Sequence, residues 1–504
     1  MKTRTSKPEL PSLTAPFLLA TQTLADNLFA DLWRHLGMTT LLRKLGFHKR
    51  SGVSASQVVY LLTMWVWVGS ESIALFARQS LRSFVQAHKD VLYSFLARED
   101  LNWRAFHGGV AGKVWRTGGL KHQARRVFVL DDSVKGRRGK RLEGVSWHFD
   151  HLSGRTLKGQ QILTLGVATE QTFLPLDSDL FISAKGAHAL KAPFADGRSV
   201  EARRYQEAQA LSKPELATAM LRRAQRQGND ADALVADAWF GTKTMVQTAL
   251  NLNLTAILRM KKNAMTYRLN SWEEGQQQTS LLDVRALYRR VVRKHWQKLN
   301  GLGYQVYPVD VELSLEGSGG EPQWVPVRLL FVRGLAETDQ DVAGPKHWAV
   351  FLCTDRTLST VDILETYALR WSIEVYFKEA KQYLGLLWEQ TETFASHLAS
   401  IHLTAVRWCF LVMGQLQGHG GRVCEVRTQL RDQLPELDFA RRLWGLFRAL
   451  IADALTDLKQ TLGEAATTIM TAIDARVHDF FVQALQLDEL TLHLEAEDSA
   501  TMAA

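Results

Sequence analysis

The sequence predicts an α/β fold with helical regions at both ends. Two observations carry this prediction. Short apolar runs at 127–130 and 233–236 each lead into aspartates, and segments with helical spacing lie between and after them. A short continuous apolar run with a polar end is typical of a buried strand. A third observation, partial alternation of apolar residues between 306 and 332, predicts a β-rich insertion.

The elements follow in order along the chain. Residues up to about 120 have helical spacing, and Gly118 and Gly119 end that region. The strand at 127–130 is followed by strands at 145–149 and 161–168 around a turn, and by a short strand at 173–177. We then expect a helix over 199–227, the strand at 233–236, a helix over 242–250 and a strand at 254–258. Changes of pattern divide the chain into 1–120, 121–263, 264–355, 356–410 and 411–504.

Composition is that of a folded, water-soluble protein. Lys and Arg number 61 against 52 Asp and Glu, a moderate basic excess compatible with a polyanionic partner. The three cysteines, Cys353, Cys409 and Cys424, form no CxxC pair, which predicts neither a zinc site nor a disulfide framework and fits a reducing cytoplasm. The most apolar run, 58–68, is too short to span a bilayer and predicts a buried core helix. No membrane association is therefore expected.

The most informative stretch is 367–381, which has no Gly or Pro and predicts one continuous helix. On that helix Arg370, Glu374 and Lys381 share a face, and Lys378 lies beside them. A carboxylate in this position can hold a divalent metal, while the cations and the hydroxyl of Tyr367 can bind phosphates. A surface helix with salt bridges is the plainer alternative.

The order Tyr367, Arg370, Glu374, Lys381 resembles the tyrosine–arginine–glutamate–lysine motif of bacterial insertion-sequence transposases, the insertion-sequence-four-like group of the DDE superfamily. The resemblance covers about residues 126–390. It implies a ribonuclease-H-like catalytic core, in which the first and fourth strands lie adjacent and parallel. It also implies that Tyr367, Arg370 and Lys381 contact phosphates of the element end. Lys378 is added to this DNA-binding set from its place on the helix.

Such a fold would bring the strand-end aspartates and the helix glutamate into one cleft. The candidate catalytic and metal-binding residues are Asp131, Asp132, Asp237 and Glu374. Asp131 and Asp132 point to opposite faces of a strand, so only one should bind metal, and the sequence leaves open which one. A helix N-cap is the alternative role for Asp237. Clustered carboxylates require a counter-ion, and two Mg²⁺, replaceable by Mn²⁺, would supply it. No phosphate-binding GxxxxGK motif is present, and no other cofactor is expected.

A tryptophan in the last insertion strand is a candidate DNA contact. In the transposases that this chain resembles, a tryptophan there stacks on a base flipped out of the DNA end. Trp348 occupies the corresponding position, and Trp324 and Trp296 are lesser candidates. The alternative is that Trp348 is a core residue of its strand.

Clusters of basic residues flank the expected acidic site and fit a path for DNA. Without such a site they would indicate only a solvated surface. These clusters are Arg137, Arg138, Lys140 and Arg141; Lys158; Arg259, Lys261 and Lys262; and Arg289, Arg290, Arg293 and Lys294.

Together these features predict a cut-and-paste DNA transposase. It would cleave the ends of its element with two metal ions, pass through a hairpin and join the ends to target DNA as a homodimer. By analogy, region 1–120 would bind DNA ends and region 411–504 would dimerise. A cytoplasmic, nucleoid-associated location is expected. Two alternatives stay open: a ribonuclease-H-like nuclease without strand transfer, and a non-catalytic DNA-binding regulator of transposition.

Overall fold

The computed structural model describes residues 28–434, apart from 86, 151–153, 185, 274–275, 294, 300–302, 318–319, 335–346 and 433, together with residues 468 and 472. The chain divides into two compact units. Unit 1 comprises residues from 1–106, 383–391 and 395–504. Unit 2 comprises 107–382 and 392–394.

Unit 2 is built on one mixed sheet, whose strand order is β2-β3-β1-β5-β6-β12-β11-β10-β7-β8. β1 runs antiparallel to β3 and parallel to β5, and β5 runs parallel to β6. This mixed α/β architecture agrees with the predicted ribonuclease-H-like fold. Its first six strands are β1 (Val127–Gly136), β2 (Ser146–Asp150), β3 (Arg155–Ala168), β4 (Phe173–Phe181), β5 (Ala233–Ala236) and β6 (Thr255–Arg259).

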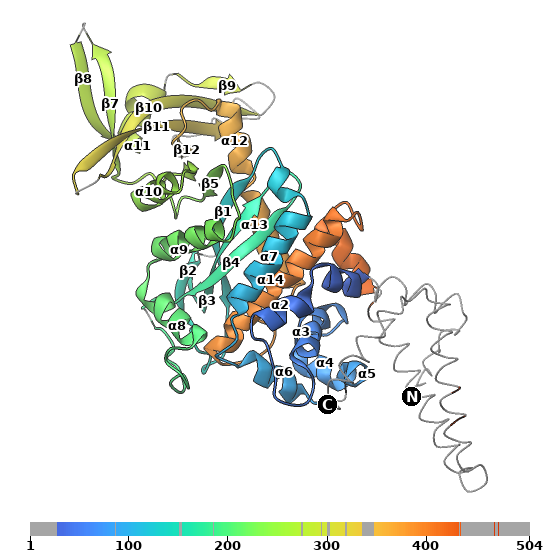
Figure 1. The fold of residues 1–504 in the computed structure, drawn as a ribbon. Coiled ribbons are helices and arrows are strands. Elements are labelled where there is room, and N and C mark those ends of the chain that lie inside the picture. The colour runs from blue at the N-terminus through green and yellow to red at the C-terminus, as the bar shows by residue number, and fades with distance from the viewer. Residues whose placement is uncertain are drawn as a thin grey trace, which may run out of the picture. The chain divides into compact units, whose positions relative to one another are not determined.

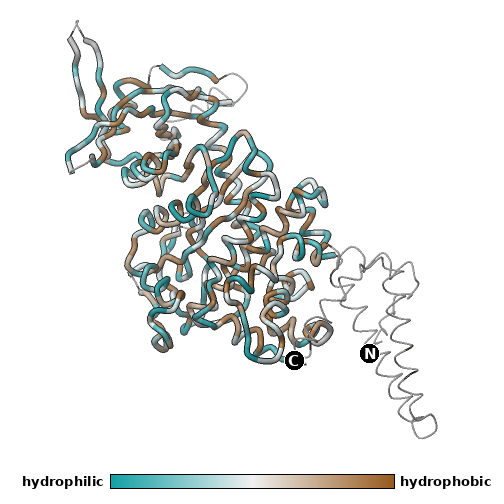
Figure 2. Tube along the Cα trace, viewed as in Figure 1, coloured by the Kyte–Doolittle hydropathy of each residue, from teal (hydrophilic) through white to brown (hydrophobic). Residues whose placement is uncertain are grey.

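The expected β-rich insertion continues the same sheet. β12 pairs antiparallel with β6 and joins the insertion to the core. The hairpin of β7 and β8 forms the far end of the sheet (Figure 1) and is mostly teal and white in Figure 2, because few of its residues are apolar. The strands are β7 (Thr266–Glu273), β8 (Gln276–Asp283), β9 (Gln297–Leu299), β10 (Tyr304–Glu316), β11 (Pro322–Gly334) and β12 (Trp348–Cys353).

Two predicted helices of unit 2 are each divided in two. The helix expected over 199–227 breaks at Ser212, where the Glu215 carboxylate accepts hydrogen bonds from the Ser212 N–H and hydroxyl, each at 2.7 Å, and starts a new helix. The helix expected over 367–381 breaks at 369–370. The helices of this unit are α8 (Val200–Ala210), α9 (Lys213–Arg226), α10 (Lys243–Asn251), α11 (Val284–Leu287), a π-helical turn (Tyr288–Val292), α12 (Thr360–Ala368) and α13 (Trp371–Gln382).

Unit 1 is helical in the part that the structure describes. Phe410 of α14 stacks on Phe29 with ring centroids 5.2 Å apart. The buried Arg407 guanidinium donates from Nε to the carbonyl of Thr63 at 3.1 Å and from Nη1 to that of Leu384 at 2.8 Å. The bond to Thr63 ties α14 to α3, which contains most of the run predicted to be a buried core helix. The helices are α2 (Met38–Lys44), α3 (Ala55–Met64), a 3₁₀ turn (Trp65–Trp67), α4 (Ile73–Gln79), α5 (Leu81–Phe84), α6 (Lys89–Leu96) and α14 (Phe394–Leu416).

α7 (Trp103–Thr117) runs from unit 1 into unit 2, and a 3₁₀ turn (Leu120–His122) leads from it to β1. The N-terminal helices and α14 thus belong to the same unit, although they are far apart in sequence. Most of the region beyond 434 lies outside the described residues, so the expected C-terminal helical region is described only at its start. Among the described helices, none has the length and apolar character needed to cross a bilayer.

Candidate active site

The first two acidic candidates meet at the end of the parallel pair β1–β5. The last paired residues are Leu130 and Ala236, so Asp131 and Asp237 follow at adjacent positions of neighbouring strands. This convergence agrees with the expectation for a ribonuclease-H-like core. One detail of the prediction is wrong: β1 does not end at the aspartates. It continues to Gly136 because its pairing with β3 extends beyond its pairing with β5.

Asp237 is held by a tight turn after β5. Its Oδ1 accepts a hydrogen bond from the N–H of Trp239 at 2.8 Å. The turn passes so close to the end of β6 that a Cβ on Gly241 would lie 2.2 Å from the carbonyl oxygen of Arg259, so glycine is required there. The N-cap of α10 is Thr242. The alternative role of Asp237 as that helix's N-cap is therefore wrong.

Glu374 reaches the site from α13, and Arg370 lies at the break before that helix. α12 ends at Ala368 and α13 begins at Trp371. Between them, the N–H of Arg370 bonds the carbonyl of Tyr367 at 3.0 Å, a bond to the third preceding residue that tightens the chain. The expected single helix is therefore wrong, and the four motif residues come from two helices and a turn.

The Arg370 guanidinium bridges two of the acids. Its Nη1 donates to Oδ2 of Asp131 at 2.9 Å, and its Nη2 donates to Oε1 of Glu374. Asp131 and Arg370 are nearly buried, with side chains 14% and 15% exposed, whereas the Glu374 side chain is 36% exposed. One cation therefore brings together the strand aspartate and the helix glutamate, which are far apart in sequence.

The pKa of Asp131 is strongly perturbed. Burial and the nearby carboxylate of Asp237 raise the pKa of Asp131 to about 7, against the opposing effect of Arg370. A carboxyl group with this pKa gains from any further cation nearby. Perturbed carboxyl groups of this kind occur preferentially at functional sites, although structural ion pairs also produce them.

Asp132 points to the other face of β1 and has different partners. Its Oδ2 accepts hydrogen bonds from Nζ of Lys213 at 2.8 Å and from the side-chain amide of Gln161. The Lys213 ammonium also lies 3.7 Å from the ring centroid of Trp239. The strand alternation noted in the sequence thus separates the two aspartates, and Asp131 is the one beside Asp237.

Lys213 is a residue that sequence reasoning missed. It lies at the start of α9 with a side chain only 7% exposed. The signal that could have found it is the capping sequence Ser212-Lys-Pro-Glu215, which marks a helix start inside the segment expected to be one helix.

Tyr367 lines a cavity beside the acids. Its ring packs edge-on against Phe351 with centroids 4.5 Å apart. Burial raises its pKa to about 12, so the phenol keeps its proton at neutral pH. The cavity, of about 580 Å³, is also lined by Arg259, Arg333 and His347. Its lining therefore contains two guanidinium groups and one carboxylate, that of Glu365, beside the Tyr367 side chain.

The remaining predicted DNA contacts differ in accessibility. Lys378 on α13 is exposed and Lys381 is half-buried. Trp348 is 6% exposed. Tyr288 stacks on its ring with centroids 4.5 Å apart and planes at 6°, and the Lys262 ammonium lies 3.9 Å from its ring centroid. This geometry favours the core alternative for Trp348. Arginines cover the lesser candidates, Arg268 over Trp324 and Arg333 over Trp296.

The acidic residues fit a hard divalent cation by their chemistry. As the side chains stand, no group of three or more His, Cys, Asp or Glu within the described residues is arranged to hold a metal ion. The Arg370 guanidinium lies where Asp131 and Glu374 would otherwise face a shared cation. Carboxylate oxygens are the ligands that Mg²⁺ prefers. The pKa of Asp131 is raised by burial and then by the Asp237 carboxylate, so a nearby cation would favour its charged form.

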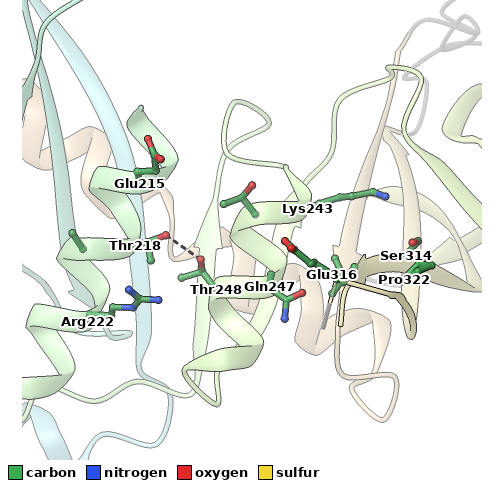
Figure 3. A pocket seen from close by; sticks show the side chains of 13 residues that line it. Glu215, Thr218, Arg222, Lys243, Gln247, Thr248, Ser314, Glu316 and Pro322 are labelled. Carbon is green, nitrogen blue, oxygen red and sulfur yellow. Dashed lines mark hydrogen bonds between the residues drawn. The ribbon is translucent and has the colours of Figure 1, made fainter. Parts of the chain in front are cut away.

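A second cavity, of about 680 Å³, lies between α9, α10 and the β10–β11 hairpin (Figure 3). Thr218 and Thr248 join the two helices by a hydrogen bond of 3.0 Å between their hydroxyls. Its charged lining is mixed, with Arg222 and Lys243 opposed by two glutamates. None of the predicted acids lines this cavity.

Two family models match the chain. Residues 58–279 match the model described as DDE superfamily endonuclease, and residues 210–410 match the one described as transposase DDE domain. The curated proteins that were searched gave no match to this chain. DDE domains act on DNA and generally use divalent metal ions. The two matches, on a fold that brings the strand aspartates and the motif glutamate to one site, support a nuclease-type enzyme of the DDE transposase class.

Proposed function

We propose that this chain is a cut-and-paste DNA transposase of the tyrosine–arginine–glutamate–lysine group. In this proposal Asp131, Asp237 and Glu374 are the catalytic carboxylates, and they would hold two Mg²⁺, with Mn²⁺ as a substitute. Asp132 is assigned a positioning role, because Lys213 and Gln161 already bind its carboxylate.

The observation that carries the proposal is the bridge made by Arg370. It joins Asp131, at the end of the parallel strand pair, to Glu374, one turn along α13. No nearby histidine is needed as a base, because divalent ions held by Asp131, Asp237 and Glu374 would supply activation of the attacking oxygen and stabilisation of the leaving oxygen.

The chain's own residues prepare the site before DNA arrives. Arg370 offsets part of the negative charge of the carboxylates. Its planar guanidinium can bind a carboxylate or a phosphate through two hydrogen bonds, so it can exchange one partner for the other. Tyr367 and Arg259 line the adjacent cavity, where a phosphate would meet a phenol donor and a cation. Lys378 and Lys381 continue this basic edge along α13.

Trp348 can stack on a DNA base only if the side chain that now covers its ring moves away. For a flipped base to stack on it, Lys262 would have to leave the ring, and a phosphate of the same nucleotide offers that ammonium a new partner. A hairpin intermediate would need such a flipped base.

The proposed reaction also bears on the oligomeric state. Two DNA ends must be cut and joined together, which favours a homodimer on DNA and subsequent strand transfer into target DNA. We also propose the five-part domain division, with DNA-end binding by region 1–120 and dimerisation by region 411–504. The proposed location is cytoplasmic and nucleoid-associated.

A cleavage assay tests the proposed function. The substrate is a labelled duplex containing the DNA that flanks this gene, incubated with the full chain and Mg²⁺. We expect a nick or hairpin at one defined position that is absent with Glu374→Gln and Asp237→Asn. Specific binding without metal-dependent cutting would contradict the enzyme and favour the DNA-binding regulator.

The match to an endonuclease model favours one alternative, a nuclease without strand transfer. A second labelled duplex as target separates the two enzymes. Joined products of higher mass are expected from a transposase, whereas cleavage without joining would leave only the nuclease.

A further inference from the structure

The strand β2, at the edge of the sheet, carries two exposed aromatic side chains. Trp147 is 46% exposed and Phe149 is 57% exposed. They are two positions apart on one strand, so they project from the same face with their Cα atoms roughly 7 Å apart. Their neighbours Ser146 and His148 are buried, and the Ser146 hydroxyl lies 3.0 Å from the His148 ring. The edge strand is thus anchored by one face and presents aromatic rings on the other.

Basic residues border these rings. Trp147 lies directly opposite Lys158 on β3, and the carbonyl of Lys158 accepts a hydrogen bond from the N–H of Arg137 at 3.0 Å. The segment 135–141 contains five cationic residues and no acid. Within the described residues, Arg138, Lys140, Arg141 and Lys158 form no ion pair with a carboxylate. Such a border suits a polyanion and is unlike the core of a protein–protein interface, which is depleted of charge.

The indole of Trp147 has a shaped support. Gly186 has φ of 64°, and a Cβ there would lie 2.4 Å from the ring. Only glycine allows the loop to pass this closely with that backbone conformation. One part of the ring is therefore supported while a large part remains open.

The surface shares a sheet face with the candidate active site. Asp131, Ser133 and Lys135 alternate along β1, and Lys135 pairs with Gln160 on β3, two residues from Lys158. From Asp131 to Arg137 the β-strand rises about 20 Å, a distance that a few nucleotides of DNA can span. A strand bound at the acids could therefore reach the aromatic residues.

We propose that Trp147 and Phe149, with Lys158 and the cations of 137–141, form a binding site for an unpaired DNA strand. Exposed rings stack on bases of any sequence, while the faces of bases within a duplex are hidden. The inference rests on the proposed function in one respect, since cleavage at an element end provides unpaired strand near the acids.

Fluorescence anisotropy of labelled dT12 and of a 12-base-pair duplex, with the full chain in EDTA, tests this site. The Trp147→Ala/Phe149→Ala variant should bind dT12 about 30-fold more weakly and the duplex no more than about threefold more weakly. Leu281→Ala is the matched control, because Leu281 is 59% exposed on β8, at the other edge of the sheet. It should bind both DNAs as the wild type does. Equal dT12 affinity in the double variant and the wild type would overturn the proposal.

Photo-crosslinking of the wild-type chain to a 5-iodouracil strand makes the test independent of how the variant folds. The crosslinked peptide should contain Trp147, and crosslinks mapped only elsewhere would contradict the site. Glu374→Gln should bind dT12 like the wild type while losing cleavage. If wild type binds dT12 through Trp147 but cuts no DNA, the proposed function fails and this site stands. If it cuts DNA and the double variant binds normally, only this site fails.

Discussion

The two faces of β1 present neighbouring aspartates with opposite surroundings. On the α13 face, burial and the neighbouring carboxylate of Asp237 raise the pKa of Asp131 to about 7, even beside Arg370. On the α9 face, Asp132 is bound by Lys213 and Gln161. Asp131 shares the Arg370 guanidinium with Glu374 and follows the same strand pair as Asp237, whereas Asp132 pairs with Lys213. We therefore propose that a divalent cation gains more from Asp131 than from Asp132, and that the two residues have different roles.

The largest effect should be on cleavage. Asp131→Asn should lower the rate of metal-dependent DNA cleavage about 10³-fold or more, since it removes a ligand worth several kcal/mol in the transition state. Asp132→Asn should lower the cleavage rate by no more than about 100-fold, because Asp132 is proposed to position other residues and not to bind the metal. Single-turnover cleavage of the flanking-DNA duplex measures both. Equal losses in the two variants would remove the distinction between the faces.

On the α9 face, Lys213→Met should destabilise the fold by about 3 kcal/mol, because it leaves the Asp132 carboxylate nearly buried without its cation. Urea unfolding measures this loss. The double variant Lys213→Met/Asp132→Asn should recover more than half of it, since no charge is then left unpaired. Additive losses would mean that the two side chains are not coupled.

On the α13 face, the stability of the fold should depend on pH through Asp131. The raised pKa of Asp131 gives the folded chain stability that is present below about pH 4 and is lost as the pH rises through about 7. Asp131→Asn lacks this titration. In EDTA, the wild type should therefore lose on the order of 2 kcal/mol relative to Asp131→Asn between pH 4.5 and 8. Parallel pH profiles in urea unfolding would contradict this.

Arg370→Gln should destabilise the metal-free chain at pH 8 by about 1–2 kcal/mol, since two carboxylates lose their shared donor. Added Mn²⁺ should restore much of that stability, because a metal ion takes over the charge compensation. Thermal unfolding with and without Mn²⁺ provides the comparison. A deficit that Mn²⁺ leaves unchanged would show that Arg370 acts only as a structural residue.

The smallest effect concerns Lys378, exposed on α13. Lys378→Gln should reduce the slope of log binding constant against log salt concentration by about 1, as expected for one lost phosphate contact. Salt titrations of duplex binding measure the slope. Lys243→Gln, at an exposed lysine of α10, is the control and should leave the slope unchanged.

Much of this site could be predicted from local sequence. The apolar runs before Asp131 and Asp237 determine buried parallel strands, and such strands end at the same edge of a sheet. The choice between Asp131 and Asp132 could not be predicted, because strand alternation separates two faces without telling which helix covers each one. That depends on Lys213 and Arg370, both far away in sequence.

The break in the motif was also hidden. Residues 367–381 contain only residues that tolerate a helix, so local propensity predicts continuity. The break coincides with the position from which Arg370 reaches Asp131, a contact that no local pattern describes. For Trp348, strand position was predictable, but the stacked Tyr288 comes from a distant segment.

Isothermal titration of Mn²⁺ into the wild type, Asp131→Asn and Asp132→Asn tests the central claim most directly. The account predicts that the wild type and Asp132→Asn bind the ion and that Asp131→Asn does not bind it measurably. Binding by Asp131→Asn with loss in Asp132→Asn would contradict the assignment, and no binding by the wild type would contradict the metal-dependent enzyme itself.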